Sequence, residues 1–265
     1  MLYLAYFIIY AFIFIFGAII GSFLNVCIYR LPTGESIVTG GSHCMTCKEK
    51  IKKYDLIPIV SYIILKGKCR SCGAKISPRY MIVEALTGVL YVLTFAYFGI
   101  NSYVEAALVC MLLSCLIIVF FMDLDTCLIN MPVVGGIGLL AVIKLVLTLT
   151  GAAEFSNPLS WQYTLFGALV ISVPFLLIFL FSKGKALGFG DVMLVLAGGA
   201  YLGLKAAIIA AFIGLITGSV AGLISKHRSG SSMFAFGPWL SLGIAVAAFF
   251  GDYLADLYLT ISGLK

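Results

Sequence analysis

The sequence predicts an all-α polytopic membrane protein with about eight transmembrane helices and one cytoplasmic zinc-binding loop domain. Composition is the first reason: 62% of the 265 residues are hydrophobic and 11% are charged, whereas a soluble domain is roughly 45–50% apolar and about 25% charged. Length is the second, because one span needs about 20 apolar residues. These two observations exclude a soluble globular enzyme, a disordered chain and a disulfide-stapled secreted domain.

Eight apolar runs are separated by turn and charge signals. The first run, 4–28, has no cation before it, so we expect a retained helix and not a cleaved signal peptide. The other runs cover 81–98, 105–122, 132–150, 162–182, 191–203, 205–224 and 238–259. The run 191–203 is shorter than a typical span, so the helix boundaries are hardest to draw near residue 203.

Basic residues concentrate in one segment, 30–80, which holds ten of the 17 Lys and Arg residues but only three acids. The positive-inside rule places this loop in the cytoplasm and the N-terminus outside. A nucleic-acid-binding protein would carry its basic patch on a soluble domain, so we expect the lipid bilayer as a partner and no nucleic acid. The same orientation brings the segments 123–131 and 183–190 to the cytoplasmic side.

Four of the eight cysteines form two Cys-x-x-Cys pairs in this basic loop. Cys44 and Cys47 are separated from Cys69 and Cys72 by 21 residues, a spacing typical of a zinc site. Four thiolates complete a tetrahedral Zn²⁺ site without an open position, so the metal is expected to be structural. Disulfides or free thiols are the alternative, and a reducing cytoplasm argues against disulfides.

Asp123, Asp125 and Asp191 stand where apolar runs meet the cytoplasmic side, and an ionisable residue at a membrane is a functional hypothesis by default. Two carboxylates brought together can share a proton, so that one activates a water while the other acts as acid. Gly188 and Gly190 would leave room for a substrate backbone. The alternative is that Asp191 caps a helix and that the other two are ordinary interfacial residues.

Five segments carry a resemblance to a known family. They are GSFLNVCIYRLP at 21–32, CMTC at 44–47, YDLIPIVSYIILKGKCRSCGAKISPRYMIVEALTG at 54–88, LGFGD at 187–191 and FGPWLSLG at 236–243. Together they resemble the bacterial type IV prepilin peptidases, which are bifunctional leader peptidase/N-methyltransferases and G-x-G-D intramembrane aspartic proteases. The match runs through most of the chain.

The resemblance assigns the aspartates. Asp191 matches the aspartate of the G-x-G-D motif. The family's other catalytic aspartate lies six residues before an aliphatic residue that is followed by proline, and counting back from Ile129 gives Asp123. Here Asn130 stands at the proline position, and a shifted register would select Asp125 instead.

We divide the chain into a first transmembrane helix (1–29), a cytoplasmic four-Cys zinc-binding domain (30–80) and a multi-helix membrane aspartic peptidase domain (81–265). The resemblance implies a multi-pass protein of the bacterial inner membrane. It further implies prepilin or pseudopilin substrates, used in type IV pili or protein secretion.

In the implied reaction, Asp123 and Asp191 cleave the leader after a glycine at the cytoplasmic face. The new N-terminal residue is then methylated with S-adenosylmethionine as donor. No glycine-rich nucleoside fingerprint is visible, so no residue is assigned to the donor. We interpret Glu84, an acid beside the zinc domain, as a partner of Arg79 and not as a contact of the substrate amine.

Two other functions are weighed. A peptidase-only intramembrane aspartic protease would resemble archaeal preflagellin peptidases, but these lack a four-Cys loop. A non-enzymatic scaffold or small transporter could use the zinc loop to dock a cytoplasmic partner. A transporter should carry acids near the bilayer midplane, and a scaffold has no need of glycines directly before a membrane aspartate.

Overall fold

A computed structural model describes residues 1–99, 102–229 and 234–263. Over these residues the chain forms nine α-helices and one short 3-10 helix, with two isolated β-bridges and no strand. Seven of the helices are long and apolar enough to cross a membrane. The predicted all-α membrane fold is therefore confirmed, and each of the eight predicted apolar runs is a helix.

The helices divide into two compact units, Met1–Tyr97 and Phe98–Lys265. The first unit contains α1 (Leu2–Thr33), η1 (Lys53–Leu56), α2 (Val60–Ile64) and α3 (Arg79–Phe98). Helices α1 and α3 approach so closely that a Cβ on Gly21 would lie 2.8 Å from Cα of Glu84. Helix α3 therefore packs with α1 in the first unit. The predicted division into domains at residues 29 and 80 stays a prediction.

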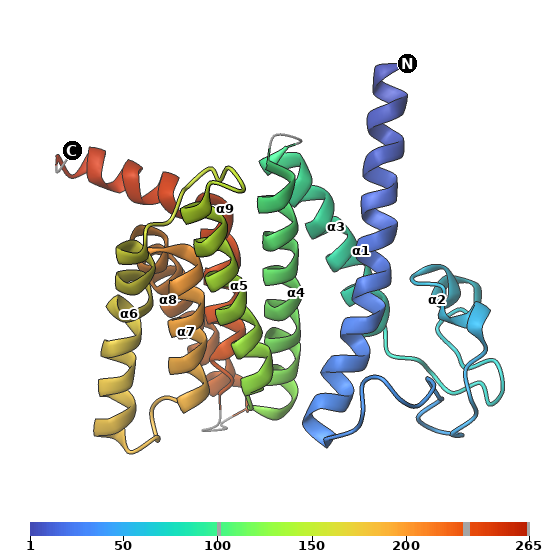
Figure 1. The fold of residues 1–265 in the computed structure, drawn as a ribbon. Coiled ribbons are helices and arrows are strands. Elements are labelled where there is room, and N and C mark those ends of the chain that lie inside the picture. Colours follow the sequence, from blue (N-terminus) through green and yellow to red (C-terminus); the bar gives the residue numbers. More distant parts are fainter. Residues whose placement is uncertain (100–101, 230–233, 264–265) are drawn as a thin grey trace. The chain divides into compact units, whose positions relative to one another are not determined.

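The second unit is a bundle built around one buried helix. Its members are α4 (Tyr103–Thr126), α5 (Met131–Thr150), α6 (Trp161–Ser182), α7 (Phe189–Leu202), α8 (Leu204–Ser229) and α9 (Gly237–Ile261). Of the seven candidate spans, α4 is the most buried, because Leu112, Leu113 and Val119 are enclosed almost completely. Figure 1 shows α4 ending, and α5 and α7 beginning, at the same end of this unit.

Helix α7 is too short to cross the bilayer alone. Its 14 residues span about 21 Å, against a hydrocarbon core of about 30 Å. It lies against α6 at Gly167 and Gly199, where a Cβ on either glycine would collide with the backbone of the other helix. Such small-residue contacts let membrane helices pack at close range, so α7 is held within the bundle and not at its surface.

A polar cluster lies at the end of the second unit where α4 begins. Glu105, in the first turn of α4, accepts hydrogen bonds from the backbone N–H and hydroxyl of Ser156 at 2.9 and 2.8 Å. The ammonium of Lys144 lies 4.9 Å from the ring centre of Tyr201. Glu105 and Asp123 are 18 residues apart, about 27 Å along the helix, so α4 is anchored near both ends.

The α6–α7 contact makes a stability prediction. Gly199→Ala should lower the free energy of unfolding by about 1–3 kcal/mol, because the new methyl group must push two backbones apart. Gly135→Ala in α5 is the control, because nothing lies within 4 Å of a Cβ there, and it should be neutral or stabilising by about 0.5–1 kcal/mol. Denaturant titration in mixed micelles measures both. Equal stability of the two variants would contradict the contact.

Candidate active site and cysteine cluster

Asp123 lies in the last turn of α4, and 4% of it is exposed. Its Oδ2 accepts a hydrogen bond of 2.9 Å from the backbone N–H of Gly237, the first residue of α9. The first N–H groups of a helix have no partner within the helix and attract negative charge. Helix α4 stops four residues later at Cys127, whose left-handed backbone conformation (φ 52°) ends the helix. The start of α9 thus holds the carboxylate at the end of α4.

Asp191 lies in the first turn of α7, and 8% of it is exposed. Its Oδ2 accepts a hydrogen bond of 3.0 Å from the backbone N–H of Gly188, so the side chain does serve as a helix cap. Its other oxygen, Oδ1, is buried and has no hydrogen-bond partner among the described residues. Capping therefore accounts for one carboxylate oxygen and leaves the second free to act.

Ile129 brings these two aspartates into one site. A Cβ on Gly190, beside Asp191, would lie 2.8 Å from Cβ of Ile129, and a Cβ on Gly237 would lie 3.0 Å from Cδ1 of the same side chain. The Asp123 and Asp191 carboxylates are close enough to interact through their charges. Two such groups share a proton more readily than both ionise, which is the condition for acid–base chemistry on a water.

Asp125, the alternative aspartate, is exposed. Two positions along a helix turn a side chain through about 200°, so Asp123 and Asp125 cannot both face the bundle. Asn130 fills the position where the family pattern has proline. It begins α5 by accepting a hydrogen bond of 3.3 Å from the N–H of Val133.

The glycines before Asp191 have a different role from the one the sequence suggested. We expected Gly188 and Gly190 to leave space for a substrate backbone. The space at Gly190 is occupied by Ile129, and a Cβ at Gly188 would lie 3.1 Å from Oδ2 of Asp191. Both positions are thus small because of contacts within the protein.

The four predicted zinc ligands lie together in the first unit. The sulfur atoms of Cys44, Cys47, Cys69 and Cys72 are all within 4.8 Å of one another, and Sγ of Cys44 lies 3.8 Å from Sγ of Cys72. Zn–S bonds of about 2.3 Å in a tetrahedron give S···S edges of about 3.8 Å, whereas a disulfide needs about 2.05 Å. All four are free thiols, and the cluster could hold a metal ion.

The two Cys-x-x-Cys pairs share one backbone conformation. In each, the N–H of the first cysteine donates to the carbonyl oxygen five residues later, at 2.9 and 2.8 Å. The residue four positions after that cysteine has a positive φ, 59° at Lys48 and 72° at Gly73. A short β-bridge closes each turn. The loop is therefore built from two copies of one turn that face each other across the four sulfurs.

Backbone N–H groups prepare the first of these thiols for metal binding. Those of Cys47 and Thr46 lower the pKa of Cys44 to about 6, and the thiolate is the form that binds metals. His43, which precedes Cys44, pairs through its backbone with Lys50. It lies outside the group of four.

Comparison with known proteins matches most of the chain to two family descriptions. Residues 15–98 match the "Bacterial Peptidase A24 N-terminal domain", and residues 110–223 match the "Type IV leader peptidase family". No solved structure is significantly similar to the chain.

Three relatives show the extent of the similarity. The chain is 35% identical over 223 residues to "Prepilin leader peptidase/N-methyltransferase" of Myxococcus xanthus, covering 83% of this chain and 64% of the relative. It is 30% identical over 254 residues to the Bacillus subtilis protein of that name, covering 94% and 98%. It is 35% identical over 250 residues to "Type 4 prepilin-like proteins leader peptide-processing enzyme" of Escherichia coli, covering 86% and 88%.

The cysteine cluster predicts the metal content of the purified protein. Full-length protein should carry about one zinc ion per chain, and Cys72→Ser should remove it because a tetrahedral site loses one of its four ligands. Cys127→Ser is the matched control, because Cys127 is exposed and lies outside the cluster. Elemental analysis of each variant measures the zinc. Unchanged zinc in Cys72→Ser would refute the site.

Proposed function

The chain belongs to the type IV leader peptidase family, and from this membership we propose that Asp123 and Asp191 are the catalytic pair of a prepilin leader peptidase. The enzyme removes the leader of type IV prepilins or pseudopilins and methylates the new N-terminal residue. In support, its relatives are named prepilin leader peptidase/N-methyltransferase. The observation that carries the assignment is the convergence of these two buried carboxylates around Ile129.

In the cleavage step the two carboxylates share one proton. The ionised carboxylate takes a proton from a water, whose oxygen attacks the carbonyl carbon of the leader's last glycine. The protonated carboxyl gives its proton to the carbonyl oxygen, which produces a tetrahedral diol. When the diol collapses, the C–N bond breaks, the leaving nitrogen takes a proton from the pair, and one hydroxyl of the diol returns a proton to the pair, which again holds one proton. Oδ1 of Asp191, which lacks a partner among the described residues, is available to the water.

The backbone donors orient this pair before a substrate arrives. The N–H groups of Gly188 and Gly237 each hold one carboxylate oxygen. A carboxylate that is fixed in advance reorganises little during the reaction, and such preorganisation is a main source of catalysis. Because both donors are uncharged, neither carboxylate is neutralised by its support.

We place the site at the cytoplasmic face of the inner membrane. The basic loop in 30–80 supports this orientation through the positive-inside rule, and α4 then descends to the cytoplasm at Asp123. The scissile bond of a prepilin, which joins a short leader to an apolar helix, would lie at that depth.

Zinc and S-adenosylmethionine are the proposed cofactors. A zinc ion held by Cys44, Cys47, Cys69 and Cys72 would fold the loop of the 30–80 domain, which is too polar to build its own core. With four thiolates the ion has no open position, so its role is structural. S-adenosylmethionine supplies the activated methyl group, and the four-Cys loop favours the bifunctional enzyme over the peptidase-only alternative.

Substitution of either aspartate tests the catalytic pair. Asp123→Asn and Asp191→Asn should each reduce leader cleavage by about 10²–10⁴-fold or more, because an amide can neither accept nor donate the shared proton. Asp125→Asn, two residues away and exposed, should cleave at a rate near that of the unchanged enzyme. The assay is intact mass of a purified prepilin over time. If Asp125→Asn is inactive while Asp123→Asn cleaves, the register is the shifted one.

The hydrogen bond to Asp123 gives a second prediction. Gly237→Ala should slow cleavage by at least about tenfold, because its Cβ would lie 2.7 Å from Oδ2 of Asp123 and displace the carboxylate. Gly138→Ala has open space around its Cβ and should leave the rate unchanged. The test compares the cleavage rates of the two variants at equal amounts of folded protein. Normal cleavage by Gly237→Ala would show that this contact does not position the aspartate.

A further inference from the structure

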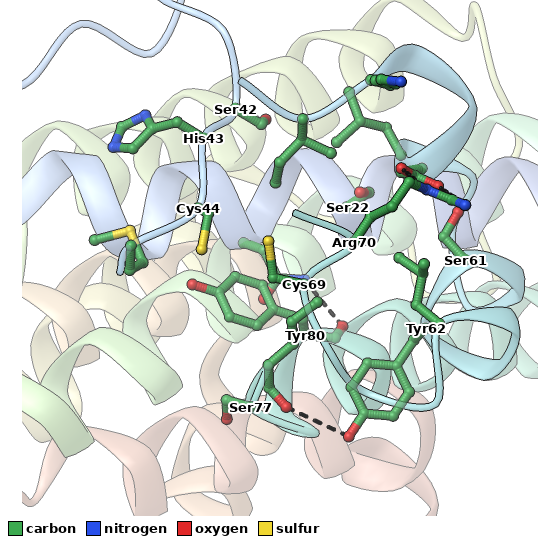
Figure 2. Close-up of a pocket in the computed structure, with 18 of the residues that line it drawn as sticks. Ser22, Ser42, His43, Cys44, Ser61, Tyr62, Cys69, Arg70, Ser77 and Tyr80 are labelled. Atoms are coloured by element: carbon green, nitrogen blue, oxygen red, sulfur yellow. Dashed lines mark hydrogen bonds and ion pairs between the residues drawn. The ribbon is translucent and has the colours of Figure 1, made fainter. Parts of the chain in front are cut away.

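The first unit contains a cavity that the peptidase mechanism does not use. It has a volume of about 460 Å³, is partly open to solvent, and is lined by the last turns of α1, the cysteine loop, α2 and the start of α3. Figure 2 shows Tyr62, Tyr80 and the facing sulfurs of Cys44 and Cys69 around it. Small-molecule sites are typically about 300–1,000 Å³ and largely apolar with a few fixed polar groups, so the cavity is of a size to hold a cofactor.

Glu84 is the buried acid that lines this cavity, with 9% of it exposed. Its Oε2 accepts a hydrogen bond of 2.7 Å from the backbone N–H of Ile59, and Ser22 of α1 also lines the cavity. Our prediction from the sequence that Glu84 forms an ion pair with Arg79 is wrong. Five helix positions separate the two residues and turn their side chains about 140° apart. Within the described residues Glu84 has no cationic partner.

Ile59, whose backbone N–H donates to Glu84, has a strained backbone conformation. Ile59 has φ 62° and ψ −51°, and the N–H of Val60 donates to the carbonyl oxygen of Pro58, which closes a γ-turn. This form of γ-turn is rare and strained, and a positive φ is a genuine outlier for a β-branched residue. Strain of this kind persists where a structure is built to position a group. The group positioned here is the Glu84 carboxylate.

The two arginines of the cavity wall already have partners within the protein, and Arg30 lies 4.0 Å from the carboxylate of Glu35. The guanidinium of Arg30 donates to the carbonyl oxygens of Ser36, Thr39, Gly40 and Gly41. That of Arg70 makes a paired hydrogen bond with Asp55 at 2.8 and 2.7 Å. The lysines that line the cavity are exposed to solvent. The buried charge that remains available to a ligand is therefore the negative charge of Glu84, which favours a cationic ligand group.

We propose that this cavity is the binding site for S-adenosylmethionine, with Glu84 facing the donor's positively charged sulfonium or amino group. The proposal rests on the methyl transfer of the proposed function and adds its location. The donor combines a flat aromatic base with a cationic chain that ends in a carboxylate. Tyrosines in the wall, a buried carboxylate and exposed lysines at the solvent side provide complementary chemistry for these three parts.

Direct binding tests the site without relying on activity. Calorimetry on the full-length, zinc-loaded protein in detergent compares three ligands: S-adenosylmethionine, S-adenosylhomocysteine and methylthioadenosine. Glu84→Gln should weaken S-adenosylmethionine at least tenfold and leave methylthioadenosine, which has neither charged group, unchanged. An equal loss with S-adenosylhomocysteine assigns Glu84 to the amino group, and a smaller loss assigns it to the sulfonium. Glu154→Gln is the matched control, because Glu154 is exposed and does not line the cavity.

The remaining outcomes separate this inference from the proposed function. If the Glu84→Gln variant does not retain zinc, a second variant, Val26→Trp, takes its place in the test. Its larger side chain fills the cavity from α1 and should abolish binding of S-adenosylmethionine. Unchanged donor affinity in the zinc-loaded variant overturns the inference while methylation by the unchanged enzyme still stands. Unchanged donor affinity with a raised KM for cleaved prepilin would overturn it in favour of the acceptor amine. Failure of the unchanged enzyme to methylate would refute the proposed function itself.

Discussion

Burial of carboxylates without charged partners is the constraint on which both sites depend. Asp123, Asp191 and Glu84 are each at most 9% exposed, and each is hydrogen-bonded by a backbone N–H, from Gly237, Gly188 and Ile59 respectively. An unpaired buried charge is costly, and a backbone N–H lowers that cost without cancelling the charge. These carboxylates consequently keep their capacity to hold a proton or attract a cation.

The same constraint explains the small residues around the aspartates. A side chain at Gly237 would collide with the carboxylate that its own N–H holds, and one at Gly190 would collide with Ile129. Glycine is thus required by close approach within the protein, and a need for substrate space does not have to be invoked. The side chain of Ile129 fills the gap between the two helix starts and fixes their spacing.

Some of this architecture could be predicted from the sequence and some could not. Apolar runs gave the helices because the bilayer demands about 20 apolar residues for each span, and the spacing of four cysteines gave their cluster. The donor at Gly237 could not be predicted, because every residue except proline has a backbone N–H and this one lies 114 residues from Asp123. The turn at Ile59 contradicts local preference, so no propensity argument would have placed Glu84 beside it.

The cysteine cluster and the cavity belong to the same unit of the chain. The aspartate pair lies wholly in Phe98–Lys265, whereas the cysteines and the cavity lie in Met1–Tyr97, so no residue is shared between the two sites. Cys44 and Cys69 themselves line the cavity. A metal ion held by the four cysteines would fold the loop and would therefore also shape one wall of the cavity. A zinc ion with no open coordination position would in this way support methyl transfer without touching either reactant.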